Sequence, residues 1–214
     1  RLLQALPEGS ISAYLPNPYL APRTLLLALA EELGVEVSGD SDDYHVLQSV
    51  NRALLAHAAA DRQVVVCIDE AQAMPLETLE SLRLLSNLET EKRKLLQIVL
   101  FGQPELDRKL ADPSVRQLLQ RIAFHYRLAG LAREEIANYL AHRLRVAGYR
   151  GEVVFGSRAV RCLHRASRGT PRLLNILAHK SLLAVYGEGK HAVRPANVRQ
   201  AAADTEGAAS AGWW

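Results

Sequence analysis

The sequence has 214 residues, of which 49% are hydrophobic and 23% charged, and its formal net charge is +3 at pH 7. This composition is ordinary for a globular protein and excludes a disordered chain, and the length suffices for one core or for one core and a small second one. No stretch approaches the roughly 18 consecutive apolar residues that a membrane-spanning helix needs. The net charge is too small to indicate nucleic-acid binding by itself. The two cysteines, Cys67 and Cys162, lie far apart and form neither a disulfide framework nor a metal site, which predicts a reducing, cytoplasmic setting.

Up to Gly130 the sequence alternates between predicted strands and predicted helices, starting with a helix over residues 1–6. Four runs predict strands, the first three apolar on both faces and the fourth alternating: Ile11 to Leu15, Val64 to Ile68, Leu95 to Phe101 and Ile122 to Leu128. Apolar residues at helical spacing predict helices at Leu25 to Leu33, at Val46 to Ala60 and, after Pro75, at Leu76 to Leu88. Buried strands that alternate with amphipathic helices predict an α/β fold whose parallel sheet is covered on both sides.

After Gly130 the pattern is helical only. Helices are predicted at Arg133 to Val146, Arg158 to Arg168, Pro171 to Tyr186 and Pro195 to Ala203, with Ser157 placed to cap the second. We therefore predict an α/β domain over residues 1–130, a small all-α domain over residues 131–204 and a flexible tail over residues 205–214. The tail ends in Trp213 and Trp214, which we interpret as an exposed stub rather than as a membrane-interface anchor.

The most specific motif is a run of β-forming residues that ends in two carboxylates, Val64-Val65-Val66-Cys67-Ile68-Asp69-Glu70-Ala71-Gln72. In open α/β sheets, ligands bind at the carboxyl ends of the strands. Asp69 can hold Mg²⁺, which prefers oxygen ligands, and Glu70 can orient a water molecule for attack on a phosphoryl group. We interpret the run as a Walker B strand; the alternative is a polar strand end that leads into a turn.

Five segments together carry a resemblance to a known family: Asp69 to Gln72, Leu82 to Thr90, Leu96 to Leu106, Gln120 to Ile122 and Arg168 to Asn175. In this order they resemble the AAA+ ATPases of the general secretion pathway A type and their relatives in mannose-sensitive haemagglutinin pilus biogenesis. The similarity covers roughly residues 1 to 200. Transposition helper ATPases are more distant relatives of the same design. The resemblance implies a P-loop NTPase (AAA+) parallel sheet, followed by a small all-α lid domain.

The resemblance also implies a role for individual residues, with ATP and Mg²⁺ as cofactors. Asp69 corresponds to the metal-binding acid and Glu70 to the catalytic base. Gln103 matches the sensor-1 position, where its amide would contact the γ-phosphate, and Arg172 matches sensor 2, where it would reach the nucleotide from the lid. Arg121 matches an arginine finger that acts on the nucleotide of a neighbouring subunit.

Each of these positions has a plainer reading as well. Gln103 can be an ordinary turn residue before Pro104, Arg121 a surface residue at a helix end, and Arg172 a residue packed at the domain junction. Arg116, about one helical turn before Arg121, is a weaker candidate for the finger.

One part of the family's pattern is missing from the sequence. A Walker A loop reads G-x-x-x-x-G-K-[ST], and no such string occurs here. In the family this loop and its strand precede the helix in which Arg1 falls, so we expect the sheet to lack its first strand. With the family's strand order 5-1-4-3-2, the strands at 95–101, 64–68 and 11–15 should pair as neighbours. The strand at 122–128 has lost its neighbour, and we expect it to stand apart, to be poorly formed or to be completed by another chain.

A basic stripe is predicted on one helical face and its continuation, because arginines recur at spacings of three and four: Arg158, Arg161, Arg165, Arg168 and Arg172. A solvated face is the plain interpretation. The alternative is contact with an anionic partner, namely a nucleic-acid backbone, lipid headgroups or an acidic subunit surface. No aromatic residues are interleaved for base stacking, which disfavours single-stranded nucleic acid.

The resemblance implies an ATPase that uses ATP hydrolysis to drive assembly or remodelling of a secretion or pilus complex. Its implied partners are its own subunits in a ring or dimer and secretion or pilus assembly proteins, with nucleic acid a less favoured partner. The implied location is cytoplasmic, including the cytoplasmic face of the inner membrane, with membrane association through segments outside this chain. Two alternatives stay open: a DNA-binding ATPase of the transposition-helper type, and a nucleotide-free interaction module, because the P-loop is absent from this sequence.

Overall fold

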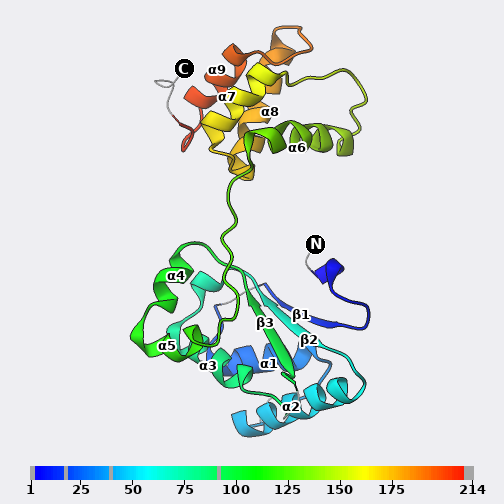
Figure 1. The fold of residues 1–214 in the computed structure, drawn as a ribbon, viewed down its shortest axis with the longest axis vertical. Helices are drawn as coiled ribbons and strands as arrows, with labels where there is room; N and C mark the ends of the chain where they lie inside the picture. The colour runs from blue at the N-terminus through cyan, green and yellow to red at the C-terminus, as the bar shows by residue number, and fades with distance from the viewer. Residues whose placement is uncertain (1–2, 17–18, 39–40, 91–92, 210–214) are drawn as a thin grey trace. The chain divides into compact units, whose positions relative to one another are not determined.

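The computed structural model describes residues 3–16, 19–38, 41–90 and 93–209. The chain divides into two compact units, residues 1–125 and residues 126–214, and each is described by itself (Figure 1). Trp213 and Trp214 lie outside the described residues, as do the first two residues of the predicted N-terminal helix, of which Leu3–Ala5 forms a short 3₁₀ turn. None of the helices in the described ranges is long and apolar enough to cross a membrane.

The first unit contains a three-stranded parallel sheet in the order β1-β2-β3. The strands are β1 (Ile11–Leu15), β2 (Val64–Ile68) and β3 (Leu96–Leu100). Residue 11 pairs with residue 64 and residue 64 with residue 96, and this register runs unbroken to the strand ends. The predicted pairing of these three segments as neighbours is therefore confirmed.

The helices of the first unit follow the predicted positions and add two short ones. They are α1 (Pro22–Glu32), α2 (Asp43–Ala59), α3 (Leu76–Ser86), α4 (Glu105–Leu110) and α5 (Arg116–Leu119), with 3₁₀ turns at Ala71–Ala73 and Pro113–Val115. Asp42 caps α2 through its carboxylate, which accepts the His45 backbone N–H at 2.8 Å. Pro22 begins α1, where its fixed φ and missing N–H carry no penalty.

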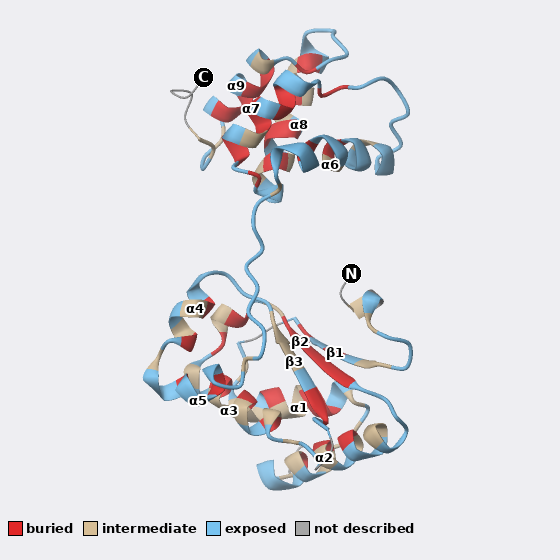
Figure 2. Ribbon diagram, viewed as in Figure 1, coloured by how far each residue is buried: buried red, intermediate tan, exposed pale blue. Residues whose placement is uncertain are grey.

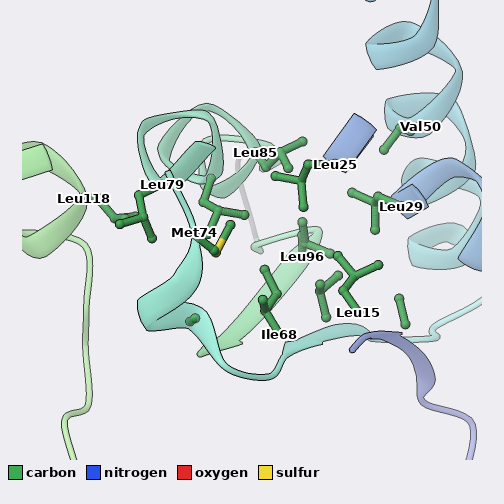
Figure 3. Packing of buried hydrophobic residues seen from close by; sticks show 14 of the residues in the cluster. Leu15, Leu25, Leu29, Val50, Ile68, Met74, Leu79, Leu85, Leu96 and Leu118 are labelled. Carbon is green, nitrogen blue, oxygen red and sulfur yellow. The ribbon is translucent and has the colours of Figure 1, made fainter. Parts of the chain in front are cut away.

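The core of the first unit lies on one face of the sheet. All five residues of β2 are buried (Figure 2). Figure 3 shows strand residues Leu15, Ile68 and Leu96 in the same cluster as side chains of the covering helices, among them Leu25, Leu29, Val50, Leu79 and Leu85. A fully buried leucine contributes about 1.5–3 kcal/mol relative to an exposed one, so this layer holds the sheet in place.

The opposite face of the sheet is only partly covered. Val65 and Cys67 of β2 are buried there, whereas Ser12, Tyr14 and Gln97 of the flanking strands are exposed. The predicted covering on both sides therefore holds over the central strand and fails over the two outer ones.

The predicted strand over Ile122–Leu128 is wrong, because these residues form neither a strand nor a helix. Its alternating apolar side chains are open to solvent: Phe124 is 95% exposed, Tyr126 83% and Leu128 86%. Among the described residues β3 has a ladder partner only in β2. A strand needs a neighbour for its backbone hydrogen bonds, so the outcome agrees with the expectation that this segment would be poorly formed.

The second unit is a helical bundle with its own core. Its helices are α6 (Arg133–Val146), α7 (Ser157–Ser167), α8 (Pro171–Gly187) and α9 (Pro195–Ala203), close to the predicted ranges. Ile136, Leu163, Leu174 and Leu177 are fully buried between them. The prediction that Ser157 caps α7 is wrong: Gly156 is the N-cap residue and Ser157 already begins the helix.

The start of the bundle is held by a close backbone crossing. The Leu131 N–H donates to the Gly169 carbonyl at 2.8 Å. A Cβ atom on Gly169 would lie 2.3 Å from the Leu131 carbonyl oxygen, and one on Gly130 would lie 2.6 Å from the Arg168 carbonyl oxygen. Both glycines are therefore needed for the two segments to touch.

Candidate active site

The carboxyl ends of β2 and β3 are held together beyond the last strand residues. The Phe101 N–H donates to the Ile68 carbonyl at 2.8 Å, and the Ala71 N–H donates to the Phe101 carbonyl at 2.8 Å. On the other side, the Asp69 N–H donates to the Leu15 carbonyl at 3.2 Å. Asp69 and Glu70 are thus fixed at the edge where the ends of the parallel strands meet, the usual ligand edge of such sheets.

Glu70 adopts a left-handed backbone conformation, with φ 52° and ψ 34°. This conformation costs a residue with a Cβ roughly 1–2 kcal/mol, and such strain gathers at functional sites. The conformation turns the chain at the end of β2, and the two adjacent carboxylates have different partners: Asp69 accepts from Tyr14, and Glu70 accepts from Gln103. The Glu70 N–H donates to the Asp69 Oδ1 at 2.9 Å, which ties the Asp69 side chain to the turn.

Gln103 lies beside Glu70, although they are far apart in sequence. The Gln103 Nε2 donates to the Glu70 Oε2 at 3.3 Å. Gln72 joins them, because its Nε2 donates to the same Glu70 oxygen and its Oε1 accepts the Gln103 backbone N–H at 3.0 Å. Gln72 therefore links the predicted base to the predicted sensor. Sequence reasoning assigned Gln72 no role, although it stands in the Asp-Glu-Ala-Gln run that carried the resemblance.

Gly102 allows the close approach of these two loops. A Cβ atom here would lie 2.8 Å from the Leu106 Cδ2 and 3.1 Å from the Gln72 Oε1. Only glycine therefore leaves the Gln72 amide free to reach the Gln103 N–H without displacing its neighbours.

Tyr14, at the end of β1, is a second residue that sequence reasoning missed. Its hydroxyl donates to the Asp69 Oδ2 at 3.3 Å. Partial desolvation raises the pKa of Tyr14, and the negative charge of Asp69 raises it further. The hydroxyl therefore stays protonated and available as a donor to the Asp69 carboxylate.

The Asp69 carboxylate fits a magnesium ion that is held mainly by waters and phosphates. Each of its oxygens accepts one hydrogen bond, from Glu70 and from Tyr14, which leaves about two of its four acceptor positions open. Within the described residues no three His, Cys, Asp or Glu side chains are arranged to hold a metal ion. Mg²⁺ bound through one carboxylate plus substrate phosphates needs no such cage.

The arginines predicted for the site do not join this cluster within the first unit. Arg121 is exposed just after α5. The hydrogen bond from Lys94 lowers the pKa of Glu89, and the charge of Arg121 adds a smaller lowering. Glu89 pairs with Lys94 at 2.8 Å, ahead of β3. Among the described residues no hydrogen bond or ion pair joins the Arg121 side chain to Asp69, Glu70 or Gln103. Arg116, the first residue of α5, is also exposed.

Arg172 belongs to the second unit. It is the second residue of α8 and is exposed, in the first turn of the helix as predicted.

Comparisons with known proteins identify the family and the fold of the chain. Residues 1–110, just over half of the chain, match the AAA domain family. The chain belongs to the AAA domain family, and its fold is that of the P-loop NTPases. It is 40% identical over 213 residues to general secretion pathway protein A of Aeromonas hydrophila, which confirms the resemblance to the secretion pathway A type.

Solved structures with the same fold are more distant in sequence. The Aeropyrum pernix ORC2 protein, solved as ADPNP–ADP complexes, matches 94% of this chain with a TM-score of 0.65 and 16% identity. Cdc6p from Pyrobaculum aerophilum matches 92% of this chain with a TM-score of 0.63 and 16% identity. At this identity the likeness establishes the fold alone.

The chain spans only part of each of these proteins. It covers 39% of the Aeromonas hydrophila protein, 54% of the ORC2 chain and 53% of the Cdc6p chain.

Proposed function

We propose that this chain supplies the residues of an ATPase site that hold Mg²⁺ and activate the attacking water. The phosphate-binding loop of the same site comes from a Walker A segment. The observation that carries the proposal is the Asp69–Glu70–Gln103 cluster at the carboxyl ends of β2 and β3, with Glu70 in a strained turn and hydrogen-bonded to Gln103. Membership of the AAA domain family supports nucleotide as the substrate.

Each residue of the cluster has a distinct task in this proposal. Asp69 holds Mg²⁺, which would neutralise charge on the phosphates when bound. Glu70 accepts a proton from the attacking water and orients it. Gln103, which Gln72 holds in place, donates a hydrogen bond from its side-chain amide to the γ-phosphate. Because Gln103 also donates to Glu70, it sets the position of the phosphate relative to the Glu70 carboxylate. Tyr14 fixes the orientation of the Asp69 carboxylate.

The two arginines complete the proposed site from outside this cluster. Arg121 is exposed just after α5 and, among the described residues, forms no hydrogen bond or ion pair with Asp69, Glu70 or Gln103. It matches the arginine-finger position, and we propose that it acts on the nucleotide of a neighbouring subunit. This proposal requires a ring or dimer. Arg172, exposed in the first turn of α8, matches the sensor-2 position, and we propose that its guanidinium group binds the γ-phosphate.

The likeness to general secretion pathway protein A supports a biological task for the turnover. We propose that ATP hydrolysis drives assembly or remodelling of a secretion or pilus complex at the cytoplasmic face of the inner membrane, with secretion or pilus assembly proteins as partners.

The sequence left open a second function, a nucleotide-free interaction module. Binding of a fluorescent ATP analogue to the 214-residue chain, with and without Mg²⁺, separates the two candidates for this polypeptide.

The ATPase proposal is tested in a protein that joins this chain, ahead of Arg1, to a Walker A segment; we call it the loop-bearing protein. Asp69→Ala should weaken Mg²⁺-dependent binding of the ATP analogue and leave Mg²⁺-independent binding unchanged, because Asp69 acts on the nucleotide only through the metal. Asp61→Ala, which removes an exposed carboxylate that pairs with Arg93, is the matched control. Equal Mg²⁺ dependence in wild type and Asp69→Ala would remove Asp69 from the proposed site.

A further inference from the structure

The second unit carries a basic hollow between α7 and α9, which lie side by side (Figure 1). The hollow has a volume of about 210 Å³ and is lined by Arg158, Arg161, Cys162, Arg165, Pro195 and Arg199. Arg199 comes from α9 and extends the predicted stripe of α7 to a second helix. Four arginines thus line one shallow surface whose lining contains no acidic residue.

In the part of the chain that the structure describes, the four arginines have no anionic partner. All four are exposed, and within the described residues none of them forms a salt bridge. Elsewhere in the same unit Lys180 pairs with Asp204 and Lys190 with Glu188, whereas Arg143 and Arg145 of α6, like these four, form no salt bridge among the described residues. What distinguishes the four arginines is that they line one surface.

The arrangement works against the stability of α7. Like charges three and four residues apart on a helix repel each other, as in the pairs Arg158–Arg161 and Arg161–Arg165. Arg158 also stands in the first turn, where the helix dipole disfavours a cation. A face that served only to keep the helix solvated would be more stable with mixed charges. The cost points to a ligand that neutralises the cluster.

The composition of the face selects the class of ligand. No large hydrophobic residue is exposed on α7 or α9. A protein partner usually meets an apolar or aromatic interface core, and a membrane partner meets apolar side chains that enter the lipid. Neither is present on this face. No aromatic residue lines the hollow for base stacking, which disfavours single-stranded nucleic acid.

We propose that the α7–α9 arginine face binds the phosphate backbone of duplex DNA without sequence preference. Arg158, Arg161 and Arg165 span about 10 Å along the axis of α7, at 1.5 Å per residue. Duplex DNA carries one charge per roughly 1.7 Å of its axis, so several phosphates fall within reach of the four guanidinium groups. Arginine forms paired hydrogen bonds with phosphate oxygens, so a surface lined by four arginines suits a phosphate backbone.

The test is binding of this chain to a labelled 30-base-pair duplex of arbitrary sequence, followed by fluorescence anisotropy between 50 and 300 mM salt. With three to four phosphates neutralised, the slope of log K against log salt concentration should be about −3. Arg161→Gln with Arg165→Gln should reduce the slope by about 2 and weaken binding at 100 mM salt by more than roughly tenfold. The melting temperature of this variant should be equal to or above that of wild type, because repulsion is relieved.

The matched control is Arg143→Gln with Arg145→Gln, which removes the same charge from exposed positions on α6. It should leave the slope within about half a unit of wild type. If the two variants weakened duplex binding equally, net charge alone would explain the effect and the proposal would be overturned. The absence of duplex binding by wild type at 50 mM salt would overturn it as well. Cosedimentation with vesicles that contain anionic phospholipid, without duplex binding, would also overturn it. No nucleotide is present, so the result is independent of the ATPase proposal.

Discussion

Gly102→Ala should disrupt the candidate site through a single added methyl group. The Cβ atom would lie 2.8 Å from the Leu106 Cδ2, 3.1 Å from the Leu106 Cβ and 3.1 Å from the Gln72 Oε1. Gly102 does not have a positive φ, so crowding alone would produce the effect. Leu106 is buried in the core and resists displacement, so the Gln72 amide should be the group that moves.

The magnitude follows from the crowding and from the entropy of the unfolded chain. Overpacking costs about 1–3 kcal/mol, and replacing glycine by alanine returns about 0.4–1 kcal/mol through the unfolded state. A net loss of about 1–2 kcal/mol lowers the melting temperature by roughly 2–8 °C in a chain of this size.

Hydrogen exchange gives a local readout of the same change. In wild type the Gln103 N–H is bound to the Gln72 Oε1 and the Phe101 N–H to the Ile68 carbonyl. In Gly102→Ala, exchange at Gln103 should accelerate while Phe101 keeps its protection. Gly187→Ala, at the end of α8 with no atom within 4 Å of the new Cβ, should leave stability unchanged or slightly raised. Wild-type exchange at Gln103 together with an unchanged melting temperature would refute the role given to Gly102.

Two further predictions concern Cys67 and Arg121. Burial raises the pKa of the Cys67 thiol above its ordinary value of 9.0. The neutral, buried thiol therefore adds to the free energy of unfolding below pH 9, and this contribution is lost as the pH rises through the folded-state pKa. The urea midpoint should therefore fall more from pH 8 to pH 10 in wild type than in Cys67→Val; equal falls would contradict this. In the loop-bearing protein, Arg121→Ala should reduce turnover by roughly 10³–10⁵-fold with nucleotide affinity kept. Mixing it with Glu70→Gln subunits should restore some turnover, and no restoration at any ratio would argue against action in trans.

The elements that the sequence predicts best are those whose pattern reports local burial. The run Val64–Ile68 matches β2 residue for residue, because a central strand is buried on both faces and reads as a continuous apolar run. The ranges of α6 and α9 were also predicted to the residue. In α9, Pro195 marks the first turn of a helix with an apolar face.

The residues that the sequence could not supply depend on contacts between distant segments. The alternation of apolar and polar residues over 122–128 shows which side chains would share a face of a strand. It does not show whether a neighbouring strand is present to accept and donate the backbone hydrogen bonds. Tyr14 reaches Asp69 across 55 residues only because the register sets Tyr14 opposite Cys67. Gln72 reaches the Gln103 N–H only because the ends of β2 and β3 are joined. Neither contact can be predicted from the residues that flank Tyr14 or Gln72 in the sequence.

ATP turnover by the Glu70→Gln form of the loop-bearing protein tests the proposed site most directly. The substitution keeps the size of the side chain and the left-handed turn, but removes the carboxylate that accepts the proton from water. Nucleotide binding should be unchanged, and hydrolysis should fall by about 10²–10⁴-fold. Turnover at the wild-type rate, with binding intact, would show that Glu70 is not the catalytic base and that the Asp69–Glu70–Gln103 cluster does not carry out the hydrolysis.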